Sequence, residues 1–264
     1  MGESPGLQEG GQESDNTIPN VKLDLHYVDP RLVAMYEDAN GRGPDTEFFL
    51  GLASQVEAET ILDLGCGTGL LTRELASKHR RVVGVDPSAA MLDYGKRQPG
   101  AERVEWIHGD SRSLPSGADL ALMTGNVAQV FLEDEEWNAT LANIRAALRP
   151  GGHLAFETRN HAARAWEHWN RDATFGTSET PHGPLDEWMD VVSVGQGRVV
   201  FEGYNVFRAT NETLVIRSEL RFRTEAEVRS SLERCGFTVE QVFGDWNSGP
   251  VTSQSQVLVF VARR

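Results

Sequence analysis

The sequence predicts an α/β fold, in which a seven-stranded, mostly parallel sheet carries helices on both faces and an antiparallel β insertion serves as a lid. Three observations lead to this fold. Short apolar segments alternate with helix-forming segments from about residue 30, and a glycine-rich turn follows the first apolar segment. After residue 180 the alternation stops, and strand-like runs follow one another without helices. The 264 residues suffice to bury one substantial core.

The parallel core is predicted over residues 21–180. Two helices come first, each opening at Asp or Pro, over 29–39 and 44–56. The segments that follow alternate in type: strand 60–64, helix 69–79, strand 81–85, helix 88–97, strand 104–108, strand 119–123, helix 134–148, turn 149–152 and strand 153–157. Because such alternation implies right-handed crossovers, it predicts a parallel, Rossmann-like sheet.

Residues 181–223 are predicted to form the antiparallel insertion. Three strand-like runs, EWMDVVSV, RVVFEGYNVF and TLVIRSELRF, are separated by short turns, a pattern typical of a meander. Residues 224–264 then complete the core with a helix and two strands. Thr224 and Glu227 form a capping box at the start of this helix, and Gly236 ends it. We expect the insertion to lie over the carboxyl edge of the parallel sheet.

Composition and charge narrow the class of protein. Residues 1–20 are rich in Gly, Ser, Glu and Gln and are expected to be disordered. The formal net charge of −14 repels phosphate backbones, which disfavours nucleic acid as a partner. Two cysteines do not make a disulfide framework, and neither a signal peptide nor a membrane-spanning run is apparent. We therefore predict a cytoplasmic monomer or homodimer without a membrane partner.

The segment ILDLGCGTGLL, residues 61–71, places one acid, Asp63, beside three glycines. Gly65, Gly67 and Gly69 permit a tight turn at the end of the first strand, where a ligand can contact the backbone. The dinucleotide fingerprint G-x-G-x-x-G is not met, because the third glycine comes one position early. Asp63 would also repel a pyrophosphate, so an NAD-type oxidoreductase on a similar fold is the less favoured alternative.

Together with the segments that follow, LDLGCGTG resembles the class I S-adenosylmethionine-dependent methyltransferases, over Tyr27 to Arg264. VVGVDPSAAML carries Asp86 at the second strand's end, where the family places the acid that holds both ribose hydroxyls. WIHGDSRSLP carries Asp110 at the third strand's end, where the family contacts the adenine amino group. LRPGGHLAFE resembles the segment leading into the fifth strand. The resemblance implies that Asp63 orients the loop and faces the positive side of the methionine moiety.

The cofactor implied is S-adenosylmethionine, with S-adenosylhomocysteine as its product. The residues that the resemblance places around it are Asp63, Gly65, Cys66, Gly67, Gly69, Asp86, Pro87, Met91, Gly109, Asp110, Ser111, Thr124, Asn126 and Gln129. Asp86 is also expected to cap the helix that follows it. Cys66 is interpreted as a packed thiol because no base accompanies it. The acidic run at 133–136 suits a helix N-terminus, and no metal is predicted.

The end of the fourth strand, LMTGNVAQVF, narrows the acceptor. It lacks the Pro-Pro-aromatic motif of enzymes that methylate base amino groups, and Met and Thr at 123–124 are unsuitable Mg²⁺ ligands. The resemblance therefore implies a metal-free methyltransferase for a small-molecule acceptor, at N or O, with the insertion covering it. The catalytic base is left open among Tyr27, His161 and Arg159. Arg159 could bind an acceptor carboxylate or pair with Glu157. A non-catalytic S-adenosylmethionine-binding protein is the alternative.

Overall fold

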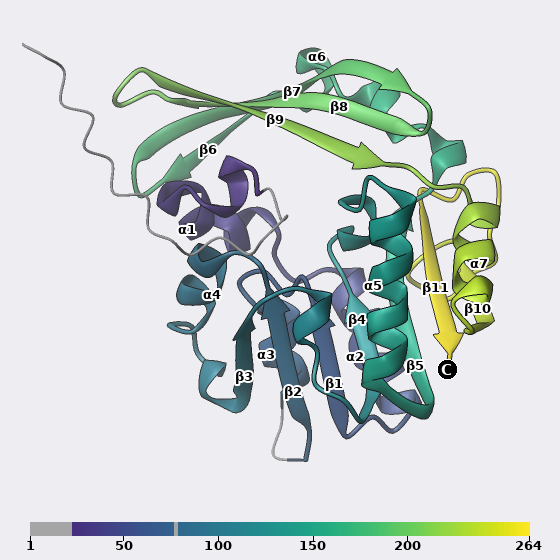
Figure 1. Ribbon diagram of the computed structural model, residues 1–264. Coiled ribbons are helices and arrows are strands. Elements are labelled where there is room, and N and C mark those ends of the chain that lie inside the picture. The colour runs from purple at the N-terminus through teal and green to yellow at the C-terminus, as the bar shows by residue number, and fades with distance from the viewer. Residues whose placement is uncertain (1–22, 77–78) are drawn as a thin grey trace, which may run out of the picture.

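The computed structural model describes residues 23–76 and 79–264, so the predicted disorder of residues 1–20 lies outside the described residues. The main sheet has the strand order β10-β11-β5-β4-β1-β2-β3 (Figure 1). Its strands are β1 (Thr60–Leu64), β2 (Arg81–Asp86), β3 (Val104–His108), β4 (Ala118–Met123), β5 (Leu148–Arg159), β10 (Thr238–Phe243) and β11 (Val257–Arg263). Strands β1 to β5 pair in parallel, whereas β11 is antiparallel to β5 and β10 to β11. The predicted seven-stranded, mostly parallel sheet is confirmed.

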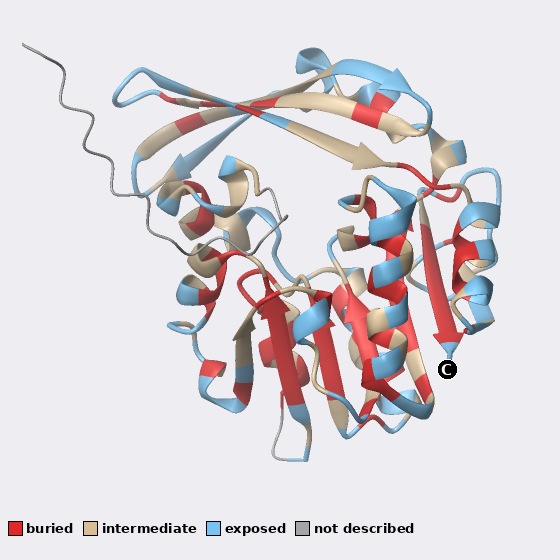
Figure 2. Ribbon diagram, in the orientation of Figure 1, coloured by how far each residue is buried: buried red, intermediate tan, exposed pale blue. Residues whose placement is uncertain are grey.

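Helices cover both faces of this sheet. The α-helices are α1 (Pro30–Ala39), α2 (Pro44–Gln55), α3 (Leu70–Leu75), α4 (Ala89–Gly95), α5 (Asp134–Ala147), α6 (Arg171–Thr174) and α7 (Glu225–Arg234). The 3-10 helices are η1 (Leu25–Tyr27), η2 (Ala101–Arg103), η3 (Ser111–Ser113), η4 (Val127–Gln129), η5 (His161–Ala163) and η6 (Ala165–His168). Trp137 of α5 and Leu232 of α7 pack on one face, while Phe49 of α2 and Leu75 of α3 pack on the other. Figure 2 shows the central strands buried along most of their length.

Local signals account for most helix ends. Pro30 occupies the first turn of α1, and the Asp29 carboxylate accepts a hydrogen bond from the Arg31 amide. The capping box of Thr224 and Glu227 at the start of α7 is confirmed. Helix α3 is shorter than predicted, because the backbone of Ala76 is already extended (ψ 120°).

The predicted turn at 149–152 lies inside a strand. Ala118 of β4 pairs with Leu148 of β5, whereas Leu120 pairs with His153, so the register shifts between the two pairs. The four residues RPGG therefore form an irregularity within β5, and Gly151 adopts a positive φ of 80° there. The predicted turn at 149–152 is therefore wrong, because these residues belong to β5, which already begins at Leu148.

The insertion is a separate antiparallel sheet in the order β6-β7-β8-β9. Its strands are β6 (Gly176–Thr180), β7 (Gly183–Gly195), β8 (Arg198–Phe207) and β9 (Glu212–Arg221). The last three match the three predicted strand runs. Strand β6 was not predicted, and it lies before residue 181. In Figure 1 this sheet arches over the carboxyl ends of β1 and β2, on the side where a lid was expected.

The antiparallel sheet is attached to the core at both ends. At one end, Leu32 of α1 packs in a cluster with Leu185, Phe207 and Ile216. The Ser218 hydroxyl of β9 also donates to the Asp24 carboxylate, which caps η1, at 2.7 Å. At the other end, buried aromatic residues of the segment after β5 pack on the sheet, in a cluster that contains Trp166, Val199 and Phe222.

Candidate active site

Three buried acids lie at the carboxyl edge of the parallel sheet. Asp63 of β1, Asp86 of β2 and Glu157 of β5 have exposed fractions of 1%, 7% and 4%. In the register of the sheet, Asp86 and Glu157 lie two residues further along their strands than the positions level with Asp63. Because side chains alternate along a strand, all three project from the same face, which α2 and α3 cover. We call these three residues the acid cluster; Asp63 and Asp86 lie on neighbouring strands, whereas β4 separates Glu157 from Asp63.

Asp63 has one satisfied oxygen and one without a partner. Its Oδ2 accepts a hydrogen bond from the Thr72 hydroxyl of α3 at 2.6 Å. Its Oδ1 is buried and has no hydrogen-bond partner. Burial raises the pKa of Asp63 to about 6, and the neighbouring charge of Asp86 adds to this effect. An acid held in this way favours a positively charged ligand.

Asp86 holds the glycine-rich turn. Its two carboxylate oxygens accept hydrogen bonds from the amides of Gly67 and Ser88, each at 2.7 Å. Burial raises the pKa of Asp86 to about 6, against the opposing effect of these two donors. The expectation that Asp86 caps α4 is wrong: the cap is Ser88, whose hydroxyl accepts from the Met91 amide. Asp86 is therefore tied to the turn of β1 as well as to its own strand.

The turn requires glycine at each of its three positions. Gly65, Gly67 and Gly69 have positive φ values of 76°, 58° and 75°. A Cβ atom at Gly65 would lie 2.4 Å from a methyl group of Val127, and one at Gly69 would lie 2.2 Å from the Trp106 ring. At Gly67 the neighbours of such an atom would be Met91 Cε at 3.2 Å and the Tyr36 ring at 3.9 Å. The turn thus brings backbone close to the acid cluster.

Glu157 ends in an unpaired oxygen. Its Oε1 accepts from the Asn126 amide at 2.6 Å, and the left-handed backbone of Asn126 (φ 64°) aims that amide at it. Its Oε2 is buried without a partner. Burial raises the pKa of Glu157 to about 7. Glu157 was not among the predicted site residues. Its position on the same face of the sheet as Asp63 follows from the strand register, which the structure gives.

Arg159 pairs with Gln129 and not with Glu157. The Arg159 guanidinium donates to Gln129 Oε1 at 3.0 Å and lies over the Trp169 ring at 5.5 Å. No ion pair joins Arg159 to an acid among the residues that the structure describes. Gln129 is fully buried, and its Nε2 lacks a partner. Two roles were suggested for Arg159, pairing with Glu157 and binding an acceptor carboxylate. The structure does not contain the pair with Glu157.

Two tyrosines from the N-terminal helices approach the acid cluster. Burial raises the pKa of Tyr27 in η1 and of Tyr36 in α1, and the charge of Asp86 contributes to both shifts. Glu157 also acts on Tyr36. The Tyr27 carbonyl accepts from the Ser88 hydroxyl, which fixes η1 to the start of α4. Tyr36 was not among the residues predicted from the sequence, because a tyrosine within a helix pattern gives no sign of which strand ends it will cover.

Four further predicted cofactor residues follow the ends of β2 and β3. Gly109 lies beside the acid cluster, because its amide donates to the Asp86 carbonyl at 3.0 Å. Asp110 binds Arg112, which lowers the pKa of this acid. Ser111 faces α5, where Asn143 donates to its hydroxyl at 3.0 Å. The Pro87 carbonyl contacts the His108 ring.

In the part of the chain that the structure describes, neither the Cys66 thiol nor the His161 ring forms a hydrogen bond to the acid cluster. Burial raises the pKa of the Cys66 thiol well above its ordinary value, so the thiolate is disfavoured. The His161 ring packs against Trp166, with the ring centres 5.5 Å apart. Thr124 is half-buried just beyond the end of β4. Within residues 23–76 and 79–264, no group of three or more His, Cys, Asp or Glu side chains is arranged to hold a metal.

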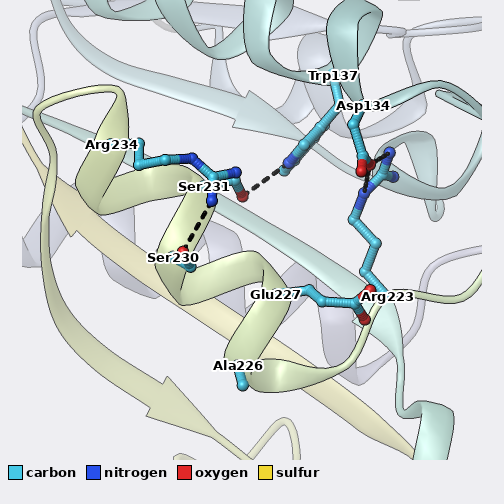
Figure 3. A pocket seen from close by; sticks show the side chains of 8 residues that line it. All are labelled: Asp134, Trp137, Arg223, Ala226, Glu227, Ser230, Ser231 and Arg234. Carbon is cyan, nitrogen blue, oxygen red and sulfur yellow. Dashed lines mark hydrogen bonds and ion pairs between the residues drawn. The ribbon is translucent and has the colours of Figure 1, made fainter.

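A hollow between α5 and α7 is lined by residues outside the acid cluster (Figure 3). Its polar side chains already have partners. Arg223 pairs with Asp134, Ser231 accepts from the Trp137 ring nitrogen, and the Arg234 guanidinium donates to the Ser230 hydroxyl. This hollow is therefore a packed helix interface and offers no unpaired group to a ligand.

Comparisons with known proteins agree with the geometry. A family model described as a methyltransferase domain matches residues 61–152. The chain is 30% identical over 213 residues to the cypemycin N-terminal methyltransferase of a Streptomyces species, covering 79% of this chain and 84% of that relative. It shares its fold with the CcbJ methyltransferase from Streptomyces caelestis, with a TM-score of 0.72 and 21% identity over 85% of this chain and 97% of the other. The fold is also similar to that of the sugar N-methyltransferase KedS8 from a Streptoalloteichus species, with a TM-score of 0.71 and 16% identity over 98% of this chain and 100% of the other.

The chain therefore belongs to the class I S-adenosylmethionine-dependent methyltransferases. The matched segment contains the glycine-rich turn, Asp63 and Asp86, the features from which the resemblance was first drawn. The residues present fit the family's cofactor: Asp63 Oδ1 is buried without a partner, and a Cβ atom at Gly67 would lie 3.2 Å from Met91 Cε, in narrow space that only a glycine leaves free. In the described part of the chain, no helix is long and apolar enough to cross a membrane.

Proposed function

We propose that the protein transfers the methyl group of S-adenosylmethionine to an amine nitrogen of a small molecule that binds between the carboxyl edge of the parallel sheet and the antiparallel sheet. The observation that carries this proposal is the surplus of negative charge in the acid cluster. The cypemycin and KedS8 relatives are named as methyltransferases of an N-terminus and of a sugar nitrogen, which supports a nitrogen acceptor.

The charge count favours an amine over an oxygen acceptor. Above about pH 7, where Asp63, Asp86 and Glu157 are all ionised, these three carboxylates and the one nearby guanidinium, that of Arg159, sum to −3 + 1 = −2. The cofactor, with its sulfonium, amino and carboxylate groups, brings a net charge of +1. An acceptor that enters as an ammonium ion would neutralise the remaining charge, whereas a phenolate or carboxylate would add to it.

In this mechanism the protein mainly positions groups and excludes water. Bound S-adenosylmethionine supplies an activated methyl carbon whose leaving group is a neutral thioether. Asp86 holds the Gly67 amide and would accept the ribose hydroxyls, while Asp63 stabilises positive charge near the turn. Tyr27 and Tyr36 cover the edge beside Asp86. The antiparallel sheet would cover the acceptor.

A matched pair of acceptors tests the proposed nitrogen specificity. The protein would be incubated with S-adenosylmethionine and either alkyl and sugar amines or the corresponding alcohols, with S-adenosylhomocysteine and methylated product measured by mass spectrometry. We expect turnover of amines and at least 100-fold lower kcat/KM for the matched alcohols, about 2.7 kcal/mol of transition-state stabilisation. Equal or better turnover of the alcohols would overturn the proposal. Binding of S-adenosylhomocysteine without any turnover would favour the non-catalytic alternative.

A further inference from the structure

We infer that Glu157 is the residue that takes the proton from the acceptor's ammonium group before methyl transfer. This inference rests on the proposed function, because it requires an amine acceptor. It assigns the base that the sequence left open among Tyr27, His161 and Arg159, and it assigns it to a residue outside that set.

The geometry leaves one oxygen of Glu157 ready for a proton. Oε1 is held by the Asn126 amide at 2.6 Å, so the carboxylate has a fixed orientation. Oε2 is buried and unpaired, although most buried carboxylate oxygens have a hydrogen-bond partner. The nearest positive group on the same strand, Arg159, donates instead to Gln129 Oε1. Glu157 is thus oriented without being neutralised.

The charged and titratable groups around Glu157 come from three elements. Asp45 at the start of α2 raises the pKa of Glu157, and Arg159 on β5 lowers it, while burial raises it most, to about 7. Tyr36 of α1 lies close enough for the charge of Glu157 to raise its pKa. A carboxyl group with a pKa near 7 is a stronger base than an ordinary glutamate and still ionised in about half of the molecules at neutral pH.

Other groups near the acid cluster are less suited to this step. The pKa values of Tyr27 and Tyr36 are raised by burial, so neither hydroxyl is ionised at neutral pH. Both oxygens of Asp86 already accept backbone hydrogen bonds. Asp63 lies two residues deeper along the sheet than Glu157 and Asp86.

The proton and electron balance of the step is complete. An N–H bond of the acceptor ammonium breaks, its electron pair stays on nitrogen, and the proton bonds to Glu157 Oε2. The nitrogen lone pair then forms the N–CH₃ bond while the S–CH₃ bond breaks, and that electron pair stays on sulfur. The products are the methylated ammonium ion, the neutral thioether and protonated Glu157, which returns its proton to water.

The substitution Glu157→Gln tests the inference, because the amide oxygen can still accept from Asn126. With an alkylamine acceptor we expect kcat to fall about 100- to 10,000-fold, the range for loss of a general base. The wild-type kcat/KM should reach a plateau above about pH 7. The kcat/KM of the variant should instead rise tenfold per pH unit up to the pKa of the amine acceptor. A weakly basic aromatic amine, which arrives without the extra proton, should be methylated by both proteins at rates within about fivefold.

Two controls keep this test decisive. Calorimetric affinity for S-adenosylhomocysteine should change less than threefold in Glu157→Gln, and the exposed Glu240→Gln on β10 should change neither affinity nor pH profile. If Glu157→Gln does not fold, Glu157→Asp should keep the wild-type pH profile at a lower kcat. Amine turnover in Glu157→Gln with an unchanged pH profile would overturn this inference alone, whereas preference for alcohols would overturn the proposed function.

Discussion

At the scale of single residues, Asp63 and Asp86 are two buried acids whose charges disfavour the fold without ligand. The folded pKa of each, about 6, lies above its ordinary value of 3.8. The stability that such an acid contributes is therefore complete below about pH 4 and is lost as pH rises through 6. A cationic ligand offsets this cost, which gives the acid cluster a direct link between cofactor binding and stability.

Asp63→Asn should reveal this link. The amide oxygen still accepts from Thr72, so the variant loses charge with little change of packing. At pH 7 the variant should have a higher unfolding free energy than the wild type, as measured by urea denaturation. At pH 4 this difference between the two proteins should be smaller. Its affinity for S-adenosylmethionine should fall more than its affinity for S-adenosylhomocysteine, which lacks the sulfonium charge. An equal loss for both ligands would contradict the role of Asp63 beside the positive group.

Asp86→Ala should weaken S-adenosylhomocysteine binding about 30- to 1,000-fold, because two charge-assisted bonds to ribose and the tie to the turn are lost together. The thermal midpoint without ligand should fall as well, since the Gly67 and Ser88 amides lose their acceptor. The exposed Asp93→Ala on α4 serves as the control and should leave both quantities unchanged. Unchanged affinity in Asp86→Ala would place the cofactor elsewhere.

At the scale of elements, α1 connects the two sheets. Leu32 packs under the antiparallel sheet, while Tyr36, one turn later, lies beside Gly67. Leu32→Ala should lower the unfolding free energy by about 2–4 kcal/mol, because it opens a cavity between α1 and that sheet. The control is Leu25→Ala, which removes a side chain that is 43% exposed and should cost under about 0.5 kcal/mol. Urea denaturation measures both, and equal losses would show that α1 is not a structural link.

The strands that could be predicted are those with a clear hydrophobic pattern or with turn residues at their ends. The parallel strands carry continuous apolar runs, and the long strands β7 to β9 carry turns between them, so both sets were predicted. Strand β6, with the sequence GTSET, is short and polar, and it exists because it pairs with β7. Tertiary pairing of this kind leaves little trace in local composition.

The same distinction applies to the site. The glycine-rich turn, Asp63 and Asp86 are close in sequence and form a motif, whereas Glu157 joins them only through the register of β1, β4 and β5. Tyr36 arrives from a helix that precedes the motif. Residues brought together by strand pairing and helix docking could not be placed before the structure was known.

At the scale of the whole molecule, the docking of α1 sets an order of events during synthesis. Asp24 and Leu32 lie near the start of the chain, yet their contacts are with Ser218 and Ile216, and the Asp24–Ser218 bond spans 194 residues. On a ribosome the first helix emerges long before its partners exist, so its apolar face waits in solvent or is held by a chaperone. Long-range closure of this kind is also slow. A chain released early, before β9, would contain every residue of the acid cluster, yet it would lack Ser218 and Ile216, two of the contacts that hold η1 and α1 in place.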